Sequence, residues 1–441
     1  MKPIVIPEYG RIERLPHNAR PLERLQAFDV NFARQNNGCQ VFDWSRRDFV
    51  RANSYVGVIM VPGLTVEILP KIDIPDKETT WGIAPYASRI RARDNLLYML
   101  SLTRNVPVEE RDLANLRFQK MPLLEVVIRI YIERLLAELR RGLDHDYIRC
   151  EENLTCLKGK ILLNSHIRQN AAHRERAFVG YDDFIADTWL NRIIKWTCLK
   201  LLALTSHAGN QKRLREAIVL LDEIRYCEIE ENDFAKVHLT RNNERYRIIL
   251  DFGRMVLLRQ SPAVGIGGEQ TFSLLFPMEK LFEEFIASFL YRHAAHFEFK
   301  RSMIHQQSKN RRLHLLRCKI ENRNKGRFQL KPDIIIDDIK EGARLILDTK
   351  WKFLKTDVED RKNGVQQIDM YQLYAYATRY RTIDNILLFP RVPGVTEKSY
   401  CLEEDEAVRL RVAMINMNFD LLTAQGQAEF KKDIYRILHL S

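Results

Sequence analysis

An apolar hairpin near the C-terminus carries charged residues where a buried pair of strands should have none. Residues 331–352 read KPDIIIDDIKEGARLILDTKWK, two apolar runs around the polar segment DDIKEG. Because alternate residues of a strand share a face, Asp348 and Lys350 should point one way and Thr349 the other. The turn should bring Asp333 back beside Asp348. We therefore expect two carboxylates and an ammonium group to meet at one edge of a sheet.

These three charged groups suit one kind of chemistry. Paired carboxylates bind Mg²⁺, with Mn²⁺ as a substitute, and the cation activates water and stabilises charge on a phosphate oxygen. A nearby lysine can position that water and offset the developing negative charge. The pattern therefore indicates hydrolysis of a phosphodiester. A surface hairpin with an ordinary salt bridge is the alternative, because the motif is short and degenerate.

The segment after the hairpin, VQQIDMYQLYAYATRY at 365–380, has helical periodicity. One face carries a polar and aromatic stripe at spacings of three, four and four: Asp369, Gln372, Tyr376 and Tyr380. Such a stripe, aimed at the hairpin, would hold Lys350 or a DNA phosphate. Packing alone is the other interpretation.

The segment before the hairpin is strongly basic. Residues 300–331 contain eleven Lys and Arg and a single acidic residue, Glu321. A basic run beside a metal site suits contact with a phosphate backbone, although a solvated loop would have the same composition. The candidate DNA-binding residues are Arg311, Arg312, Lys331 and Lys352.

Composition favours a nucleic-acid partner. The chain of 441 residues has a net charge of +12, which fits double-stranded DNA first and an anionic membrane surface second, with solubility as the plain alternative. There is no apolar run of about 18 residues and no signal-peptide pattern, so we expect a cytoplasmic protein without a membrane anchor. The seven cysteines include no CxxC pair, so neither a disulfide framework nor a zinc knuckle is expected.

Three regions follow from the change of period along the chain. Residues 1–93 are β-rich, with a hairpin over 54–72 that turns at Pro62-Gly63. Residues 94–262 are mainly helical, and the Gly- and Pro-rich segment 261–270 is the best linker. Residues 270–441 read as αβββαβ, an α/β domain in a chain that is α+β overall.

Within the helical region, three stretches have clear 3.6-residue periodicity: 121–143, 181–206 and 212–227. Gly142 is a plausible end for the first helix, and Asp187 or Thr188 lies near the start of the second. The segment 156–184 between them is basic and less regular.

Several segments of the chain resemble a known nuclease family. KPD…LDTKWK followed by QLYAY resembles the PD-(D/E)xK nuclease superfamily, in the RecB-like branch with a Q-x3-Y helix. Three further segments are similar to the McrC family, the nuclease subunits of McrBC modified-cytosine restriction systems. They are VPGLTVEILPKI at 61–72, LKGKILLNSHIRQN…YDDFIADTWLNRIIK at 157–195 and LLFPMEKLFEEFIASFL at 274–290.

The resemblance implies roles for particular residues. Asp333 and Asp348 match the metal-binding acids, and Lys350 matches the catalytic lysine. Gln372 and Tyr376 match the Q-x3-Y pair, which completes the expected catalytic set.

A supporting metal ligand is implied on the first helix of the C-terminal domain. Glu283 matches this acid, with Glu284 as the second choice. Some RecB-like relatives hold an iron–sulfur cluster through four cysteines, but the cysteine spacing here does not support one.

The resemblance also implies a partner, a McrB-like AAA+ hexamer that hydrolyses GTP or ATP and usually reads the modified DNA. The McrC-like subunit would dock on the ring through its N-terminal half, stimulate hydrolysis and cut. This chain has no GxxxxGK[ST] loop, so it should bind no nucleotide of its own. Basic residues that would face the ring are Lys158, Lys160, Arg168, Arg174 and Arg176.

Two other readings stay open: an activator that docks on the ring with a weak or vestigial nuclease site, and a RecB-like repair nuclease without a ring partner. The sequence leaves undecided the modification recognised, the partner's nucleotide, the stoichiometry and the number of metals. A single nuclease site per chain makes it plausible that two complexes pair to cut both strands.

Overall fold

The computed structural model describes residues 3–14, 18–72, 86–103, 121–258, 271–306, 313–317, 326–338, 342–354, 362 and 364–439. The chain divides into two compact units, one made of residues 1–123 with 261–441 and the other of residues 124–260. The three regions expected from the sequence, 1–93, 94–262 and 270–441, stay a prediction, whereas the units join the first and last parts of the chain. None of the described helices combines the length and hydropathy of a membrane-spanning segment.

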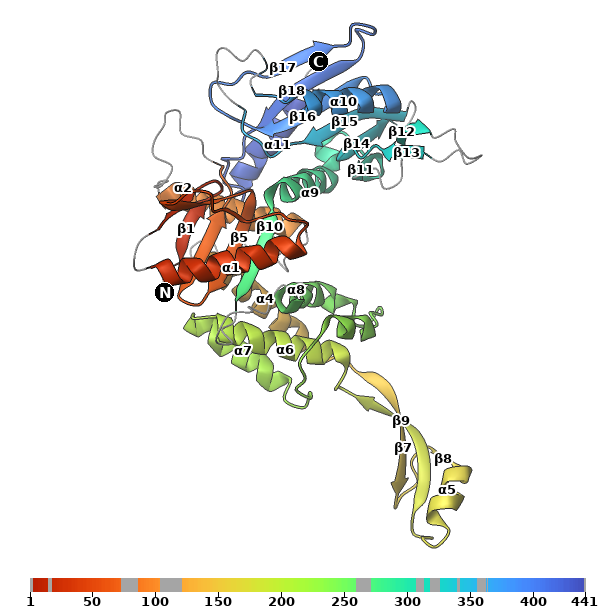
Figure 1. The fold of residues 1–441 in the computed structure, drawn as a ribbon. Helices are drawn as coiled ribbons and strands as arrows, with labels where there is room; N and C mark the ends of the chain where they lie inside the picture. Colours follow the sequence, from red (N-terminus) through yellow and green to blue (C-terminus); the bar gives the residue numbers. More distant parts are fainter. Residues whose placement is uncertain are drawn as a thin grey trace. The chain divides into compact units, whose positions relative to one another are not determined.

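A four-stranded sheet near the N-terminus includes a strand from far along the chain (Figure 1). Its strands, in spatial order, are β1 (Ile4–Pro7), β6 (Leu64–Leu69), β5 (Tyr55–Val61) and β10 (Phe272–Pro277). The expected hairpin is present as β5 and β6, and Gly63 in its turn has a φ of +83°. A Cβ on Gly57 would lie 1.9 Å from the carbonyl oxygen of Leu274, so β10 can approach β5 only beside a glycine.

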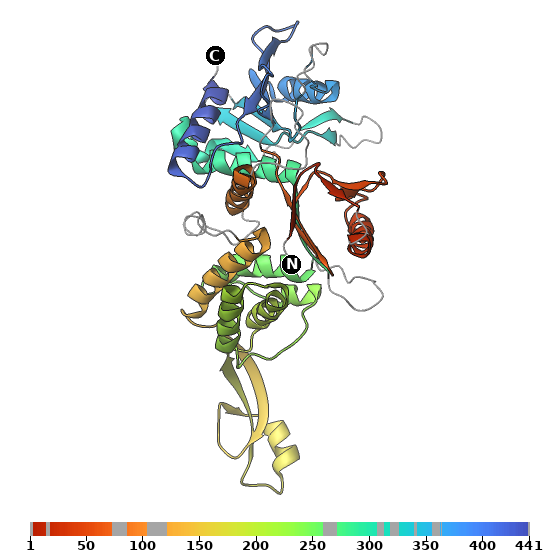
Figure 2. The ribbon, with the colours of Figure 1, turned by 90° about the vertical axis from the view of Figure 1, so that its left-hand side faces the viewer.

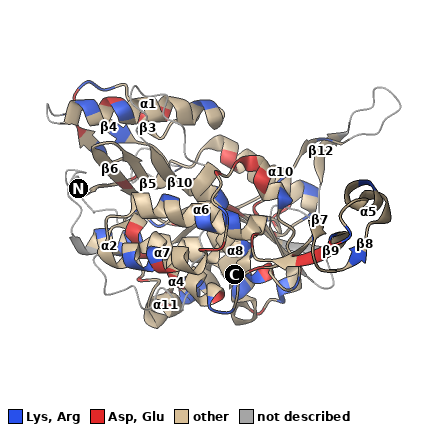
Figure 3. Ribbon diagram, turned by 90° about the horizontal axis from the view of Figure 1, so that it is seen from below, with Lys and Arg blue, Asp and Glu red and all other residues tan. Residues whose placement is uncertain are grey.

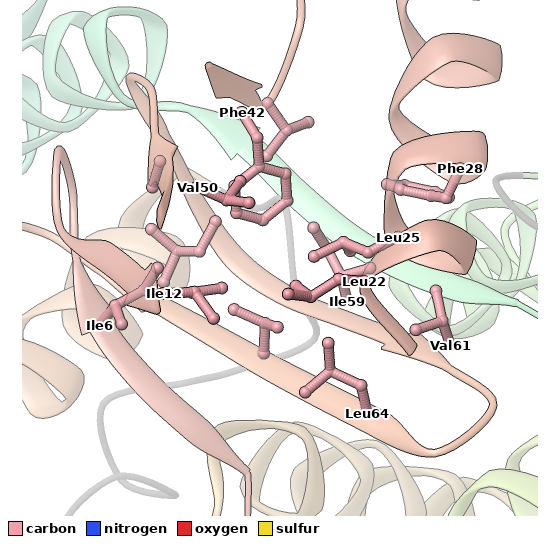
Figure 4. Close-up of a cluster of buried hydrophobic side chains, with 14 of the residues drawn as sticks. Ile6, Ile12, Leu22, Leu25, Phe28, Phe42, Val50, Ile59, Val61 and Leu64 are labelled. Carbon is pink, nitrogen blue, oxygen red and sulfur yellow. The ribbon is translucent and has the colours of Figure 1, made fainter. Parts of the chain in front are cut away.

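Helix α1 (Ala19–Gln35) covers this sheet, and the sequence did not predict it. Leu22, Leu25 and Phe28 lie three residues apart and are buried against the strands, as Figure 4 shows. A small sheet completes this core. Its strands are β2 (Arg11–Glu13), β4 (Phe49–Ala52) and β3 (Phe42–Asp43).

A six-stranded mixed sheet forms the C-terminal part of the same unit. Its strands, in spatial order, are β11 (Ile304–Gln306), β14 (Ile334–Asp338), β15 (Gly342–Thr349), β16 (Asp384–Pro390), β18 (Arg409–Ile415) and β17 (Lys398–Cys401). β14 and β15 pair antiparallel, whereas β15, β16 and β18 run parallel. Every residue of β16 is buried, so both faces of the sheet are covered.

Three helices cover this sheet: α9 (Met278–Arg292), α10 (Gln367–Tyr380) and α11 (Ala424–His439). Leu373, Tyr376 and Ala377 of α10 share a core with residues of β14, β15, β16 and β18. On the remaining face, α9 and α11 pack together through Phe285 and Phe430, whose ring centroids are 5.6 Å apart. Helix α2 (Tyr86–Leu102) packs on α9 through Tyr98 and Phe285.

The expected αβββαβ order is present with two differences. The strand expected at about 297–305 begins with the 3₁₀ turns Ala294–Phe297 and Arg301–Met303, and only β11 is extended. An additional hairpin, β12 (His314–Arg317) and β13 (Gly326–Gln329), lies within the basic segment.

The second unit combines helices with a β-rich extension. Its helices are α4 (Leu123–Leu139), α5 (Leu163–Asn170), α6 (Trp189–Leu204), α7 (Ala208–Leu220) and α8 (Arg247–Leu258), with 3₁₀ turns at Glu231–Lys236 and Glu244–Tyr246. Thr188 caps α6 by accepting a hydrogen bond from the backbone N–H of Asn191, as expected from the sequence.

Residues 146–185, here called the arm, lie in the region expected to be mainly helical, and the sequence did not predict the strands found there. They form β7 (Asp146–Leu154), β8 (Lys160–Ile161) and β9 (Ala177–Ile185), with α5 packed against β9. Figures 1 and 2 both show β7 and β9 running away from the helices of this unit. Most of β7 is exposed, so its sequence lacks the apolar alternation by which strands are recognised.

Candidate active site

The two acidic residues of the hairpin meet where β14 begins and β15 ends. Ile334 pairs with Leu347, which places Asp333 across from Asp348. Oδ2 of Asp333 accepts hydrogen bonds from the backbone N–H and the hydroxyl of Thr349, at 2.7 and 2.8 Å. Asp348 is only 1% exposed, and its Oδ1 has no hydrogen-bond partner among the described residues.

Thr349 differs from its expected orientation. Strand alternation predicted that its side chain would point away from the acids, yet its hydroxyl reaches Asp333. The reason is local, because Asp333 precedes β14 and β15 ends at Thr349, so regular pairing does not extend to this contact. Sequence reasoning therefore missed Thr349 as a residue of the site.

Lys350 lies between the acids and helix α10. Its ammonium group forms an ion pair with Oδ2 of Asp348 and donates to Oε1 of Gln372 at 3.4 Å. Its backbone N–H donates to Leu388, which attaches this position to the central strand β16. Asp348 and Lys350 thus share a side, as strand alternation predicts.

Helix α10 presents Gln372 to the hairpin, whereas Tyr376 and Tyr380 pack in the same core as Leu373 and Ala377. Gln372 donates from Nε2 to the hydroxyl of Tyr376 at 2.6 Å, and Tyr376 is buried. Asp348, Lys350, Gln372 and Tyr376 therefore form one continuous chain of polar contacts. The helix positions Gln372 and Tyr376 one turn apart, so both reach the same edge of the sheet.

Burial and charge shift the ionisation of this cluster. Burial, followed by the charge of Glu283, raises the pKa of Asp333, and burial with the charge of Asp333 raises the pKa of Asp348. For Lys350, burial acts in the opposite sense, but the nearby carboxylates outweigh it and raise the pKa. Burial and the charge of Asp348 also raise the pKa of Tyr376. The site therefore holds a charged lysine beside acids that resist ionising together.

The pKa shifts also distinguish between Glu283 and Glu284, the two candidate acids on α9. Glu283 is close enough for its charge to raise the pKa of Asp333. Glu284 instead lies 3.8 Å from Lys280, one turn earlier on the same helix. Of the two glutamates, Glu283, the first choice, is the one whose charge affects Asp333.

A hard divalent cation fits this donor set. The part of the chain that the structure describes holds no group of three or more His, Cys, Asp and Glu side chains placed to hold a metal ion. Mg²⁺ does not need three such side chains, because it usually keeps several waters and uses one or two carboxylates together with substrate phosphates. Asp348, with a buried oxygen that lacks a partner, and Asp333 supply such carboxylates.

The candidate DNA-binding residues divide into two groups. Arg311 and Arg312 lie outside the described residues. Lys331 is exposed, and Lys352 lies 3.6 Å from Asp369 and 3.1 Å from Oε1 of Gln366. Figure 3 shows Lys and Arg spread among Asp and Glu over helices of both units.

The cysteines form no cluster in the described structure. Those described are free: Cys39, Cys150, Cys156, Cys198, Cys227 and Cys401. Cys318 lies outside the described residues.

Comparisons with known proteins give the chain a context. The family described as McrBC 5-methylcytosine restriction system component matches residues 50–390. A chain of the refined half-complex from the tetradecameric assembly of Thermococcus gammatolerans McrB AAA+ hexamers with bound McrC covers 99% of this chain and 100% of its own, with a TM-score of 0.72 and 19% identity. No curated protein matches the sequence.

A second solved structure is similar over a shorter part. It is a chain of the Thermococcus gammatolerans McrBC complex, seen by cryo-electron microscopy, with a TM-score of 0.54 and 22% identity. It covers 66% of this chain and 88% of its own. At these identities the two structures establish a shared fold.

Proposed function

Since the chain belongs to the family of McrBC 5-methylcytosine restriction system components, we propose that it is the DNA-cutting subunit of such a system. Its activity would be that of a Mg²⁺-dependent endonuclease, with a restriction-endonuclease-like PD-(D/E)xK domain at the C-terminus. One observation carries this proposal: the buried Asp348 is paired with Lys350, which is joined in turn to Gln372 and Tyr376.

The residues divide the chemistry of phosphodiester hydrolysis among them. Asp333 and Asp348, supported by Glu283, would hold Mg²⁺, which supplies a polarised water and stabilises charge on the phosphate. The ammonium group of Lys350 would orient the attacking water and offset the charge that develops on the phosphate oxygens. Gln372 accepts from Lys350 and donates to Tyr376, which restricts the directions that the ammonium group can take.

The substrate we propose is double-stranded DNA. A net charge of +12 favours a polyanion. Lys331 is exposed and lies two residues before Asp333, and Lys352 lies two residues after Lys350. The basic segment that includes Arg311 and Arg312 would add phosphate contacts. With one site per chain, two complexes would have to pair to cut both strands.

The partner we propose is a hexameric AAA+ protein that hydrolyses GTP or ATP. In the Thermococcus gammatolerans assembly, McrB AAA+ hexamers carry bound McrC. The present sequence lacks a GxxxxGK[ST] motif, so the nucleotide would belong to the partner.

The arm is the best candidate for docking on that partner. It carries large apolar side chains in exposed positions: Tyr147, Ile148, Leu157, Leu163, Ile167 and Phe184. Several exposed apolar side chains within one part of a fold are typical of an interaction surface. Basic residues of the same segment, including Lys158 and Lys160, lie among them.

Two other functions make different predictions. An activator with a vestigial site would stimulate the partner without cutting, and the intact Asp333, Asp348 and Lys350 argue against it. A repair nuclease without a ring would have no use for the exposed arm. An AAA+ reading frame beside the gene would favour the two-component system.

The decisive experiment uses the chain together with its AAA+ partner. Purified complex, Mg²⁺ and nucleotide would be given plasmid with and without modified cytosine, and Asp348→Asn would be compared with wild type. We expect wild type to cut and Asp348→Asn to stimulate nucleotide hydrolysis without cutting. Glu404→Gln, an exposed acid, is the matched control and should cut normally.

Equal cutting by Asp348→Asn would overturn the site assignment. Stimulation without any cutting by wild type would instead establish the activator.

A further inference from the structure

A buried hydrogen bond links the N-terminal sheet to the residue that follows the lysine of the site. Nε1 of Trp351 donates to Oε2 of Glu8 at 2.9 Å, although the two residues are 343 positions apart. Glu8 is 0% exposed and Trp351 is 2% exposed. Because Trp351 is bonded directly to Lys350, this contact fixes the chain at the edge of the site.

The carboxyl group of Glu8 is held by the backbone of the N-terminal sheet. Glu8 follows β1, and its N–H donates to the carbonyl of Leu69, the last residue of β6, at 2.9 Å. The N–H of Lys71 donates to Oε2 of Glu8 at 3.2 Å. Since β1 and β6 pair in parallel, their C-terminal ends lie side by side and together hold the carboxyl group of Glu8.

The indole ring of Trp351 is enclosed by aromatic neighbours. Its centroid lies 5.0 Å from the ring of Phe282 and 5.7 Å from that of Phe353. The ammonium group of Lys71 lies 5.0 Å from the centroid of Phe353. Phe282 immediately precedes Glu283, so the same packing contacts the helix that carries the third acid.

The N-terminal sheet also positions that helix directly. β10, its fourth strand, ends at Pro277, and α9 begins at Met278. The N–H of Met278 donates to the carbonyl of Ser54 at 2.8 Å, next to the paired end of β5. Both the lysine and the helix acid are therefore placed relative to one sheet.

We propose that Glu8 is a positioning residue for the nuclease site, which acts through Trp351 to hold Lys350 in place. The N-terminal sheet is then a working part of the site as well as a scaffold. This inference rests on the proposed nuclease function. A buried indole N–H without an acceptor destabilises the folded state. The end of the strand would therefore shift until this N–H finds a partner. Displacements of about 1 Å at a reacting group can lower rates by about a hundredfold.

The protonation state of Glu8 indicates that glutamine is a conservative replacement for it. Burial raises the pKa of Glu8 to about 8, so the carboxyl is mostly protonated near neutral pH. Glutamine has the same shape and keeps a carbonyl acceptor for Trp351 and Lys71. Glu8→Gln should therefore restore what Glu8→Ala removes.

The test compares four variants in complex with the AAA+ partner: Glu8→Ala, Glu8→Gln, Trp351→Phe and the double variant Glu8→Ala/Trp351→Phe. Trp351→Phe removes the N–H donor and keeps an aromatic ring beside Phe282. We expect Glu8→Ala and Trp351→Phe each to lower kcat for cutting about tenfold or more, with KM for DNA within about twofold. Glu8→Gln should stay within about threefold of wild type, and the double variant should be no worse than Glu8→Ala.

Nucleotide hydrolysis by the partner provides the control readout. We expect all four variants to stimulate it like wild type, as should Glu13→Ala, an exposed acid of the same part of the chain. If Glu8→Ala fails to fold, Trp351→Phe and Glu8→Gln decide the result.

Several outcomes would overturn the inference: wild-type kcat in Glu8→Ala or in Trp351→Phe, a Glu8→Gln variant as slow as Glu8→Ala, or equal loss of cutting and stimulation. Losses that multiply in the double variant would also overturn it. A wild-type complex that cuts nothing would refute the proposed function itself, which is a separate result.

Discussion

Lys350 forms an ion pair with Asp348, and the carboxylate of that pair is only 1% exposed. A buried pair contributes little net stability, but removing one partner leaves an uncompensated charge inside the protein. The arrangement therefore makes the folded chain sensitive to each partner, and a bound cation would compensate for a missing lysine.

Replacing the lysine tests this dependence. Lys350→Met should lower the free energy of unfolding by about 3 kcal/mol near neutral pH without metal, because Asp348 loses its cation. Added Mg²⁺ should recover part of that loss by binding the folded state. Denaturant unfolding with and without Mg²⁺ measures both effects, and cutting should fall at least about a hundredfold.

Lys280→Met is the matched control for that variant. Its ammonium group lies 3.8 Å from Glu284 and its side chain is 64% exposed, so its removal should change stability by less than about 0.5 kcal/mol. Equal effects of the two substitutions would contradict the buried-pair argument.

The raised pKa values of the two acids predict an unusual dependence on pH. Burial and repulsion by Asp333 raise the pKa of Asp348 above its ordinary 3.8. Between 3.8 and the raised value, the folded chain therefore binds more protons than the unfolded chain. The stability from this group is complete below 3.8 and is lost as the pH rises through the raised value. Melting curves in EDTA between about pH 4 and 8 should record this loss, and Asp348→Asn should reduce it.

Cutting should change with pH in the opposite direction. Metal binding needs ionised carboxylates, so activity should rise over the same window in which metal-free stability falls. Parallel changes in the two quantities would argue against the acids as metal ligands.

Asp369 should tune the site from helix α10. Its charge contributes to raising the pKa of both Asp348 and Lys350, and it lies 3.6 Å from the ammonium group of Lys352. Asp369→Asn should therefore move the acid limb of the pH–rate profile to lower pH. An unchanged profile would exclude this coupling, and Glu404→Gln serves as the control.

The hydroxyl of Thr349 should matter more than its methyl group. Thr349→Val keeps the volume and loses the hydrogen bond to Asp333, so stability should fall by about 1 kcal/mol and cutting several-fold. Thr349→Ser retains the hydroxyl and should cut nearly as well as wild type. Thermal melts and initial cutting rates separate the two variants.

Substitutions in the arm should affect stimulation of the partner's nucleotide hydrolysis. Leu163 and Ile167 are one turn apart on α5 and are 65% and 67% exposed, so Leu163→Asp with Ile167→Asp should leave folding intact. If the arm docks on the partner, stimulation of nucleotide hydrolysis should fall at least about tenfold. Val219→Asp, at a 71% exposed position of α7, controls for the added charge. Normal stimulation by the double variant would exclude this surface.

The candidate site could be predicted from the sequence because its parts are local. Asp333, Asp348 and Lys350 belong to one hairpin, whose pairing follows from two apolar runs around a short polar turn. Gln372 and Tyr376 are one helical turn apart, so periodicity alone places them on a common face. The contacts of Lys350 with Asp348 and Gln372 agree with these rules.

The sequence did not predict the strands of the arm or the helix α1, for different reasons. β7 and β9 are nine-residue strands stabilised by pairing with each other, and much of their surface is exposed, so no apolar alternation marks them. The helix α1 lies between strands in a region whose β-branched runs dominate the pattern. Tertiary packing of Leu22, Leu25 and Phe28 decides that segment.

By itself the sequence determined which residues could do chemistry, because strand and helix periods place nearby residues on common faces. Only the tertiary structure decided what holds those faces in position. It added β10 to the N-terminal sheet beside β5 and placed Glu8 in contact with Trp351 across 343 positions. Such contacts depend on how distant elements pack, and a single sequence carries no local period that records them.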